Sequence, residues 1–254
     1  MNRIQKTFSS AKEQGRSVFV AYLTVGCPTL EGTLKAIDKL VEGGADVIEL
    51  GIPFSDPFAD GAVIRSAAYK AIAQGVDMDA VLSVATEARR RHPETPFVAF
   101  GYYNMIFSYG NEKFAGKAAA AGIDAVLAVD LPLEERGELV PVLKKHGLAF
   151  IPLIAPNTPM ERVRRSAEGM EDGFLYAMTV KGVTGVRGSL PDDVAGRLDA
   201  IRRETGMSVV AGFGISSRGQ GEALVKGHAD GYVIGSAIVK KLCEEGWEKA
   251  ESLV

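Results

Sequence analysis

The fold is constrained most strongly by a regular alternation, from residue 18 onwards, of short apolar runs with longer segments of helical periodicity. The runs are rich in β-branched residues and contain few polar positions, which is typical of strands buried on both faces. In the longer segments Leu34, Ile37 and Leu40 fall on one face of a helix. Eight runs predict strands, at 18–24, 47–50, 97–100, 125–129, 149–153, 174–178, 208–211 and 232–234.

Parallel strands fit this order, because each crossover between them needs a helix-length return. Three short turns recur between a helix end and a strand start, and glycine suits such turns because it tolerates positive φ. They are Gly44-Ala45-Asp46, Gly122-Ile123-Asp124 and His228-Ala229-Asp230. Eight such units without a dividing linker predict one domain over 1–254, a closed (β/α)₈ TIM barrel with an extra N-terminal helix. A doubly wound open sheet is the alternative.

Composition excludes several classes of protein. The 29 basic and 32 acidic side chains give a net charge of −3, so we expect binding neither to nucleic acid nor to a charged membrane surface. The N-terminus has no apolar signal region, and no uncharged stretch approaches the roughly 18 residues that span a bilayer. Cys27 and Cys243 match no metal or redox spacing, and a secreted disulfide framework would use more cysteines. A reducing cytoplasm is the simplest interpretation.

Active sites of such barrels lie at the carboxyl ends of the strands. The histidines, His92, His146 and His228, fall near the opposite ends, so we expect no metal site there. Glu49 lies near the carboxyl end of its apolar run, and strand alternation directs it into the barrel. Burial there would raise its pKa into the range of a general acid or base. A solvated glutamate is the alternative.

The stretch after Glu49 reads GIPFSDPFADG and adds two carboxylates, Asp56 and Asp60, without a cation. Pro53 and Pro57 restrict its conformation. Two carboxyls in different surroundings can act as proton donor and as permanent anion. A turn or a helix cap is the alternative role for either aspartate.

Glycine-rich stretches follow the last three predicted strands: KGVTGVRG at 181–188, GFGISS at 212–217 and GSAIV at 235–239. Glycine lets backbone N–H groups approach an anion, and a helix that starts there adds its positive dipole end. The last two stretches predict a phosphate site. The first suggests a mobile lid. Ser217 and Gln220 fit a capping box.

The predicted strands contain no lysine for a Schiff base, and GxSxG and Walker sequences are absent. The chemistry that these absences leave is acid–base catalysis by carboxylates on a phosphorylated small molecule.

Five motifs together resemble the tryptophan synthase α subunit family across nearly the whole chain: ELGIPFSDPFADG, AVDLPLEE, GVTGVRG, GFGIS and GSAIVK. That family cleaves indole-3-glycerol phosphate to indole and glyceraldehyde 3-phosphate by a reverse aldol reaction, without a cofactor of its own.

The resemblance implies a role for each matching residue. Glu49 would protonate the indole ring carbon at the bond to be broken, and Asp60 would hold the indole N–H and stabilise positive charge on the ring. Thr184 would close the lid. The implied phosphate contacts are Gly185, Gly214, Gly235 and Ser236, and the implied indole pocket is Tyr22, Phe100, Tyr176 and Phe213.

The resemblance also implies a partner, a β subunit that uses pyridoxal phosphate to join indole to serine in an α₂β₂ complex. Pro53 and Asp56 would lie at that interface. Phe58, Ala62 and Cys27 depart from the family's usual residues. Two alternatives stay open: a stand-alone lyase that releases free indole, and a non-catalytic barrel that activates its partner.

Overall fold

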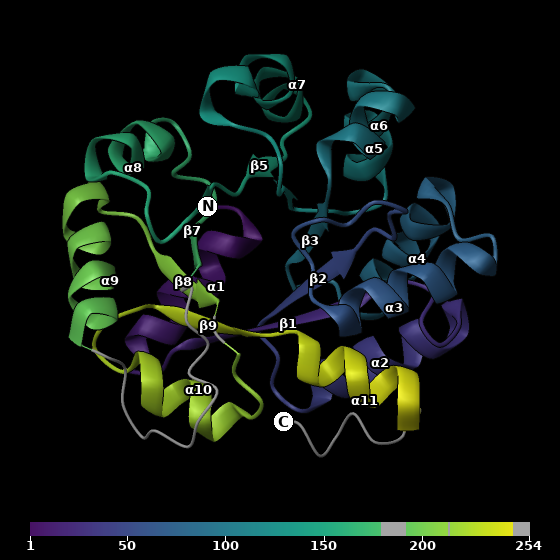
Figure 1. Ribbon diagram of the computed structural model, residues 1–254, viewed down its shortest axis with the longest axis horizontal. Helices are drawn as coiled ribbons and strands as arrows, with labels where there is room; N and C mark the ends of the chain where they lie inside the picture. Colours follow the sequence, from purple (N-terminus) through teal and green to yellow (C-terminus); the bar gives the residue numbers. More distant parts are fainter. Residues whose placement is uncertain (179–191, 213, 246–254) are drawn as a thin grey trace.

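The computed structural model describes residues 1–178, 192–212 and 214–245, and its parallel strands curl around a central axis inside a ring of helices (Figure 1). Each strand pairs with its neighbours in the order β5-β4-β3-β2-β1-β9-β8-β7-β6. The strands are β1 (Val18–Thr24), β2 (Val47–Gly51), β3 (Phe97–Gly101), β4 (Ala125–Ala128), β5 (Ala149–Phe150), β6 (Leu153–Ile154), β7 (Leu175–Met178), β8 (Val209–Gly212) and β9 (Gly231–Ile234).

The two ends of this order, β5 and β6, are halves of one predicted strand, 149–153. Proline has no N–H for a ladder, and Pro152 interrupts the run. Pairing nevertheless continues on both sides, because the Ile151 N–H donates to the Val126 carbonyl at 2.9 Å and the Tyr176 N–H donates to the Pro152 carbonyl at 3.0 Å. The barrel is therefore closed and the predicted (β/α)₈ fold is confirmed, with the open-sheet alternative wrong.

Helices cover the outside of the barrel, and one closes its N-terminal end. That helix, α1, begins with a capping box between Asn2 and Gln5 and packs Phe8 on Phe174, with ring centroids 5.5 Å apart. The extra N-terminal helix is thus confirmed. The helical elements are α1 (Arg3–Glu13), α2 (Leu30–Glu42), α3 (Ala62–Ala73), α4 (Met78–Arg91), α5 (Tyr103–Tyr109), α6 (Asn111–Ala120), the 3₁₀ helix η1 (Leu133–Glu138), α7 (Val140–Lys145), α8 (Met160–Ala167), α9 (Asp192–Thr205), α10 (Arg218–Val225) and α11 (Ser236–Glu245).

The core has two parts, because successive strand residues face opposite sides. Outward-facing Ile48 and Leu50 belong to the cluster between strands and helices. Inward-facing Val47 joins Val98 and Val210 in the cluster inside the barrel. This alternation determines on which side of β2 the side chain of Glu49 lies.

The recurring helix-to-strand turns have a common construction. In each, an aspartate exchanges hydrogen bonds with the preceding strand: its N–H donates to a carbonyl there, and its carboxylate accepts the N–H of the same residue at 2.8–2.9 Å. An arginine pairs with each carboxylate at 2.6–2.9 Å. The three sets are Asp46 with Phe19 and Arg16, Asp124 with Phe97 and Arg89, and Asp230 with Val209 and Arg202. These Asp turns fix the N-terminal ends of the strands.

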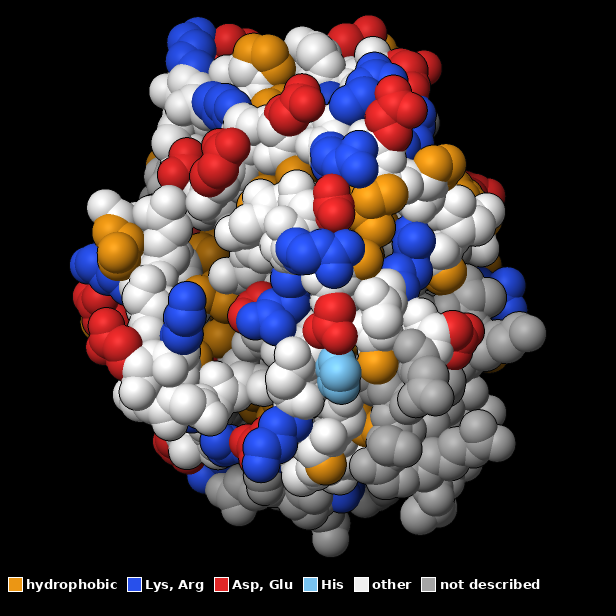
Figure 2. All heavy atoms as spheres, turned by 90° about the vertical axis from the view of Figure 1, so that its left-hand side faces the viewer, with side chains coloured by type: hydrophobic (Ala, Val, Ile, Leu, Met, Phe, Trp, Pro, Cys, Tyr) orange, Lys and Arg blue, Asp and Glu red, His pale blue; other side chains and the backbone are white. Residues whose placement is uncertain are grey.

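The histidines lie at these helix ends, as predicted. Each has one carboxylate beside a ring nitrogen, at 2.7–3.0 Å: His92 with Asp38, His146 with Glu112 and His228 with Asp199. Positive and negative side chains are also interspersed over the face seen from the side of α8 and α9 (Figure 2). On α8, Arg162 pairs with Glu134 and Arg164 with Glu204. Within the described ranges, no helix combines the length and apolar character needed to cross a bilayer.

The two cysteines form a disulfide in the structure, with Cα atoms 5.7 Å apart. Their spacing, 216 residues, suggested no redox pairing, and this interpretation was wrong. The barrel places its first strand beside its last, so residues after β1 meet helix α11. Localisation in the cytoplasm stays a prediction.

Candidate active site

Glu49 is fully buried inside the barrel, between its register partners Tyr22 on β1 and Val98 on β3. Among the residues that the structure describes, neither of its carboxylate oxygens has a hydrogen-bond partner. Burial raises the pKa of Glu49 to about 8, because the charged form loses hydration without compensation. At neutral pH the side chain is therefore a protonated acid facing the interior.

Asp60 lies in the loop that joins β2 to α3 and is held by Tyr102. The Tyr102 hydroxyl donates to Asp60 Oδ2 at 3.0 Å and accepts the Ala59 N–H at 3.1 Å. Burial raises the pKa of Asp60, and the hydrogen bond from Tyr102 opposes that rise. Unlike Glu49, Asp60 has a donor that stabilises its anion.

Tyr102 is the site residue that sequence reasoning missed. Its ring also packs on Phe54 and Phe58, with centroids 5.0 and 5.3 Å away, so it supports the whole loop after β2. It stands directly after β3, where the strand end faces that loop. The position after a barrel strand was the available signal, but the pairing spans 42 residues and has no local pattern.

Three predicted pocket residues form an aromatic wall beside Glu49. The Phe100 ring contacts Tyr22 edge-on, with centroids 5.1 Å apart, and Tyr176 at 6.3 Å. Strands β3 and β7 are not neighbours, so the second contact crosses the barrel. Burial, followed by nearby carboxylates that include Glu49 and Asp60, raises the pKa of both tyrosines. The structure thus brings these aromatic rings and the two acids together.

The glycine-rich turns after β8 and β9 lie at the same end of the barrel. Gly235 precedes helix α11, and a Cβ placed on it would lie 3.5 Å from the Tyr22 side chain. Ser236 is the first residue of that helix. A Cβ on Gly214 would have no described atom within 4 Å. The turn after β9 is therefore in contact with the aromatic wall.

The predicted capping box after β8 forms in part. Ser217 caps α10 by accepting the Gln220 N–H, but the Gln220 side chain accepts the Ser216 N–H at 3.0 Å instead of that of Ser217. Three further predicted site residues, Thr184, Gly185 and Phe213, lie outside the described residues.

The loop after β2 is partly exposed. Pro53 is buried, whereas Asp56 is exposed and accepts a hydrogen bond from the Ser55 hydroxyl. Phe58 has 75% of its surface exposed, and Phe107 on nearby α5 has 61%. Two large apolar side chains are thus exposed at the end of the barrel that holds Glu49.

A cavity of about 800 Å³ lies elsewhere, between α1 and the turns before β8 and β9. Its lining includes Lys12, Arg202 and Asp230 and none of the site residues above. It is separate from Glu49, because these turns are at the N-terminal ends of the strands.

Comparison with known proteins agrees with this geometry. Residues 8–254 match the family model described as tryptophan synthase alpha chain. The tryptophan synthase alpha chain of Geobacter sp. (strain M21) is 42% identical over 253 residues, covering 100% of this chain and 93% of the relative.

Solved structures give the same result. Tryptophan synthase subunit alpha from Legionella pneumophila superposes with a TM-score of 0.90 at 33% identity, covering 100% of this chain and 95% of the other. A chain of the tryptophan synthase α₂β₂ complex from Pyrococcus furiosus has a TM-score of 0.86 at 38% identity, covering 94% and 95%. The chain belongs to the tryptophan synthase alpha chain family.

Proposed function

We propose that this chain cleaves indole-3-glycerol phosphate to indole and glyceraldehyde 3-phosphate, with Glu49 as the acid–base group. The observation that carries the proposal is the buried Glu49 carboxyl, which has a raised pKa and no hydrogen-bond partner in the described part of the chain. A buried polar group without a partner is costly to keep, so such a group suggests a bound ligand as its partner.

The proposed chemistry divides between the two acids. Protonated Glu49 gives its proton to the ring carbon that carries the glycerol chain, while Asp60 accepts the indole N–H and stabilises the positive ring. The carbon–carbon bond then breaks, and its electrons restore the aromatic ring. The resulting Glu49 carboxylate takes the hydroxyl proton of the departing chain, which leaves as the aldehyde. The proton balance closes without a cofactor in this chain.

Substrate binding would use the rest of the site. Tyr22, Phe100 and Tyr176 supply aromatic surface for indole. Backbone N–H groups at Gly214 and Gly235, with the Ser236 hydroxyl, would bind the phosphate at the start of α11. Thr184, Gly185 and Phe213 belong to the proposal through the family resemblance alone.

We further propose a β subunit as partner, in an α₂β₂ complex in which that partner holds pyridoxal phosphate. The Pyrococcus furiosus relative is from such a complex. The exposed Phe58 and Phe107 provide apolar surface at the site end of the barrel, next to the loop that contains Pro53 and Asp56. Contact of the partner with the loop after β2 would change the position of Asp60, which lies in the same loop.

The central test is release of indole from indole-3-glycerol phosphate by the purified chain, with and without a β subunit. Glu49→Gln should lower turnover by about 100- to 10,000-fold, the usual contribution of a general acid. Its affinity for glycerol 3-phosphate should stay within about tenfold, or about 1.4 kcal/mol, of the unaltered chain. Near-normal cleavage by this variant would refute the proposed role.

The same assay separates the alternatives. Turnover accelerated by the β subunit supports the complex, whereas fast turnover of the isolated chain without acceleration indicates a stand-alone lyase. Binding of the partner without any cleavage by the chain indicates a non-catalytic barrel.

A further inference from the structure

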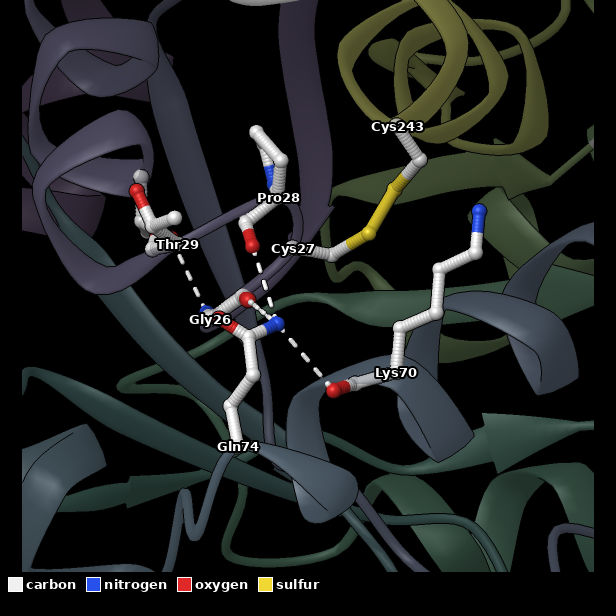
Figure 3. Close-up of a disulfide and its surroundings, with 8 residues drawn as sticks. Gly26, Cys27, Pro28, Thr29, Lys70, Gln74 and Cys243 are labelled. Atoms are coloured by element: carbon white, nitrogen blue, oxygen red, sulfur yellow. Dashed lines mark hydrogen bonds between the residues drawn. A yellow bond between two sulfur atoms is a disulfide. The ribbon is translucent and has the colours of Figure 1, made fainter.

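The Cys27–Cys243 disulfide joins two parts of the chain that border the proposed phosphate site. Cys27 lies in the turn after β1 and is 2% exposed, whereas Cys243 lies on α11 and is partly exposed. Figure 3 shows the bond running from this turn to the last helix, above the end of α3. The bond therefore connects the first and last units of the barrel.

The turn at Cys27 is held in place by hydrogen bonds to neighbouring helices. Gln74, at the end of α3, donates to the Gly26 carbonyl at 3.3 Å and to the Pro28 carbonyl at 2.9 Å (Figure 3). The Gly26 N–H in turn donates to the Thr33 hydroxyl at 2.9 Å. Hydrogen bonds on both sides of Cys27 thus fix it to α2 and α3.

Helix α11 carries the other half-cystine on the face that meets the barrel. Ser236, Val239 and Cys243 are spaced by three and four residues, so they share one helix face. Val239 is buried in the same cluster as Cys27 and Tyr22. The disulfide therefore holds α11 about two turns from the N-terminus proposed to bind phosphate.

We propose that Cys27–Cys243 is a reversible redox site whose oxidised form holds α11 in the phosphate-binding position. What α11 binds rests on the proposed function above; the redox reaction does not. The sequence predicts a reducing cytoplasm, and disulfides in proteins of such compartments are mostly transient or redox-sensing.

The reaction partner is a dithiol. One of its thiolates attacks the partly exposed Cys243 sulfur, a mixed disulfide forms, and Cys27 leaves as a thiolate that takes up a proton. The second dithiol sulfur then displaces Cys243, which leaves as a thiolate and is protonated. The protein gains two electrons and two protons, and the dithiol becomes a disulfide.

Reduction leaves α11 held by noncovalent contacts of residues such as Ile238 and Leu242. We expect the reduced chain to bind glycerol 3-phosphate about three- to tenfold more weakly, because the N-terminus of α11 is no longer fixed to the turn at Cys27. We also expect its Tm to fall by about 5 °C or more, since the bond closes a very long loop.

The experiment uses the full chain, oxidised with glutathione disulfide or reduced with dithiothreitol. Thiol titration in denaturant should find no free thiols in the first and both in the second. Calorimetry then measures glycerol 3-phosphate affinity, and a thermal scan measures Tm. Cys243→Ser should match the reduced chain under both conditions, and Glu244→Ser, an exposed change on the same helix, should keep the redox response.

Two free thiols in the oxidised sample, or affinities that agree within about twofold between the states, would overturn the proposal. If Tm shifts between the two redox states but neither state binds glycerol 3-phosphate, the phosphate assignment is refuted and the redox site is still supported. Cys27→Ser provides a second variant if Cys243→Ser does not fold.

Discussion

Glu49 and Asp60 are both carboxylic acids at one end of the barrel, but they differ in their hydrogen-bond donors. Glu49 has none over the described ranges, and Asp60 has the Tyr102 hydroxyl. Strand alternation predicted the inward orientation and raised pKa of Glu49 from local sequence alone. The Tyr102 contact could not be predicted in this way, because it depends on how β3 and the loop after β2 meet in space.

The raised pKa of Glu49 predicts a pH dependence of stability. Between its ordinary value, 4.5, and about 8, the folded protein keeps a proton that the unfolded chain has released, so the free energy of unfolding falls as pH rises through this window. Glutamine cannot ionise, so Glu49→Gln avoids this loss. We expect the variant to be more stable than the unaltered chain at pH 8 by roughly 1 to 4 kcal/mol, and nearly equal at pH 5. Urea denaturation at both pH values measures this; an equal difference at both would contradict it.

Tyr102→Phe tests the support of Asp60. The variant loses the donor to Asp60 and the acceptor of the Ala59 N–H, so we expect kcat/KM to fall about 10- to 100-fold, or about 1 to 3 kcal/mol. Loss of a bond that lowers the pKa of Asp60 should also move the acidic limb of the pH profile to higher pH. A uniform loss of activity with an unmoved limb would indicate a purely structural role for the hydroxyl.

At the scale of elements, the apolar runs predicted seven of the barrel strands to within one residue at each end. They did so because continuous β-branched runs without alternation suit few structures other than buried parallel strands. The run at 149–153 was less accurate, because Pro152 divides it. The disulfide could not be predicted either, since it follows from the adjacency of β1 and β9.

The end of β2 offers a test of packing between elements. A Cβ on Gly51 would lie 2.3 Å from the Tyr22 hydroxyl and 2.9 Å from the Leu23 carbonyl oxygen. Gly51→Ala should therefore displace Tyr22, cost about 1 to 3 kcal/mol of stability and raise KM. Gly196→Ala on α9 is the matched control, because its Cβ meets open space; it should stabilise the protein by about 0.5 to 1 kcal/mol. Equal effects of the two changes in chemical denaturation would contradict the packing explanation.

For the whole molecule, the exposed apolar side chains lie at the end of the barrel that holds the two acids. Phe107 is 61% exposed and packs on Tyr103. If this surface binds the β subunit, Phe107→Ser should leave the turnover of the isolated chain within about twofold. The concentration of β that gives half-maximal acceleration should rise at least about tenfold, or about 1.4 kcal/mol. Titration of the chain with β measures both. Unchanged acceleration would place the interface elsewhere.

The three Asp turns join neighbouring strands at the end of the barrel opposite Glu49, and their residues lie outside the loops after the strands. The turns that hold the strands together and the loops that form the candidate site thus come from different stretches of the chain. A protein engineer could randomise the loops beside the aromatic wall in search of other aromatic substrates while the Asp turns keep the barrel folded. New specificity would then not require a loss of thermal stability.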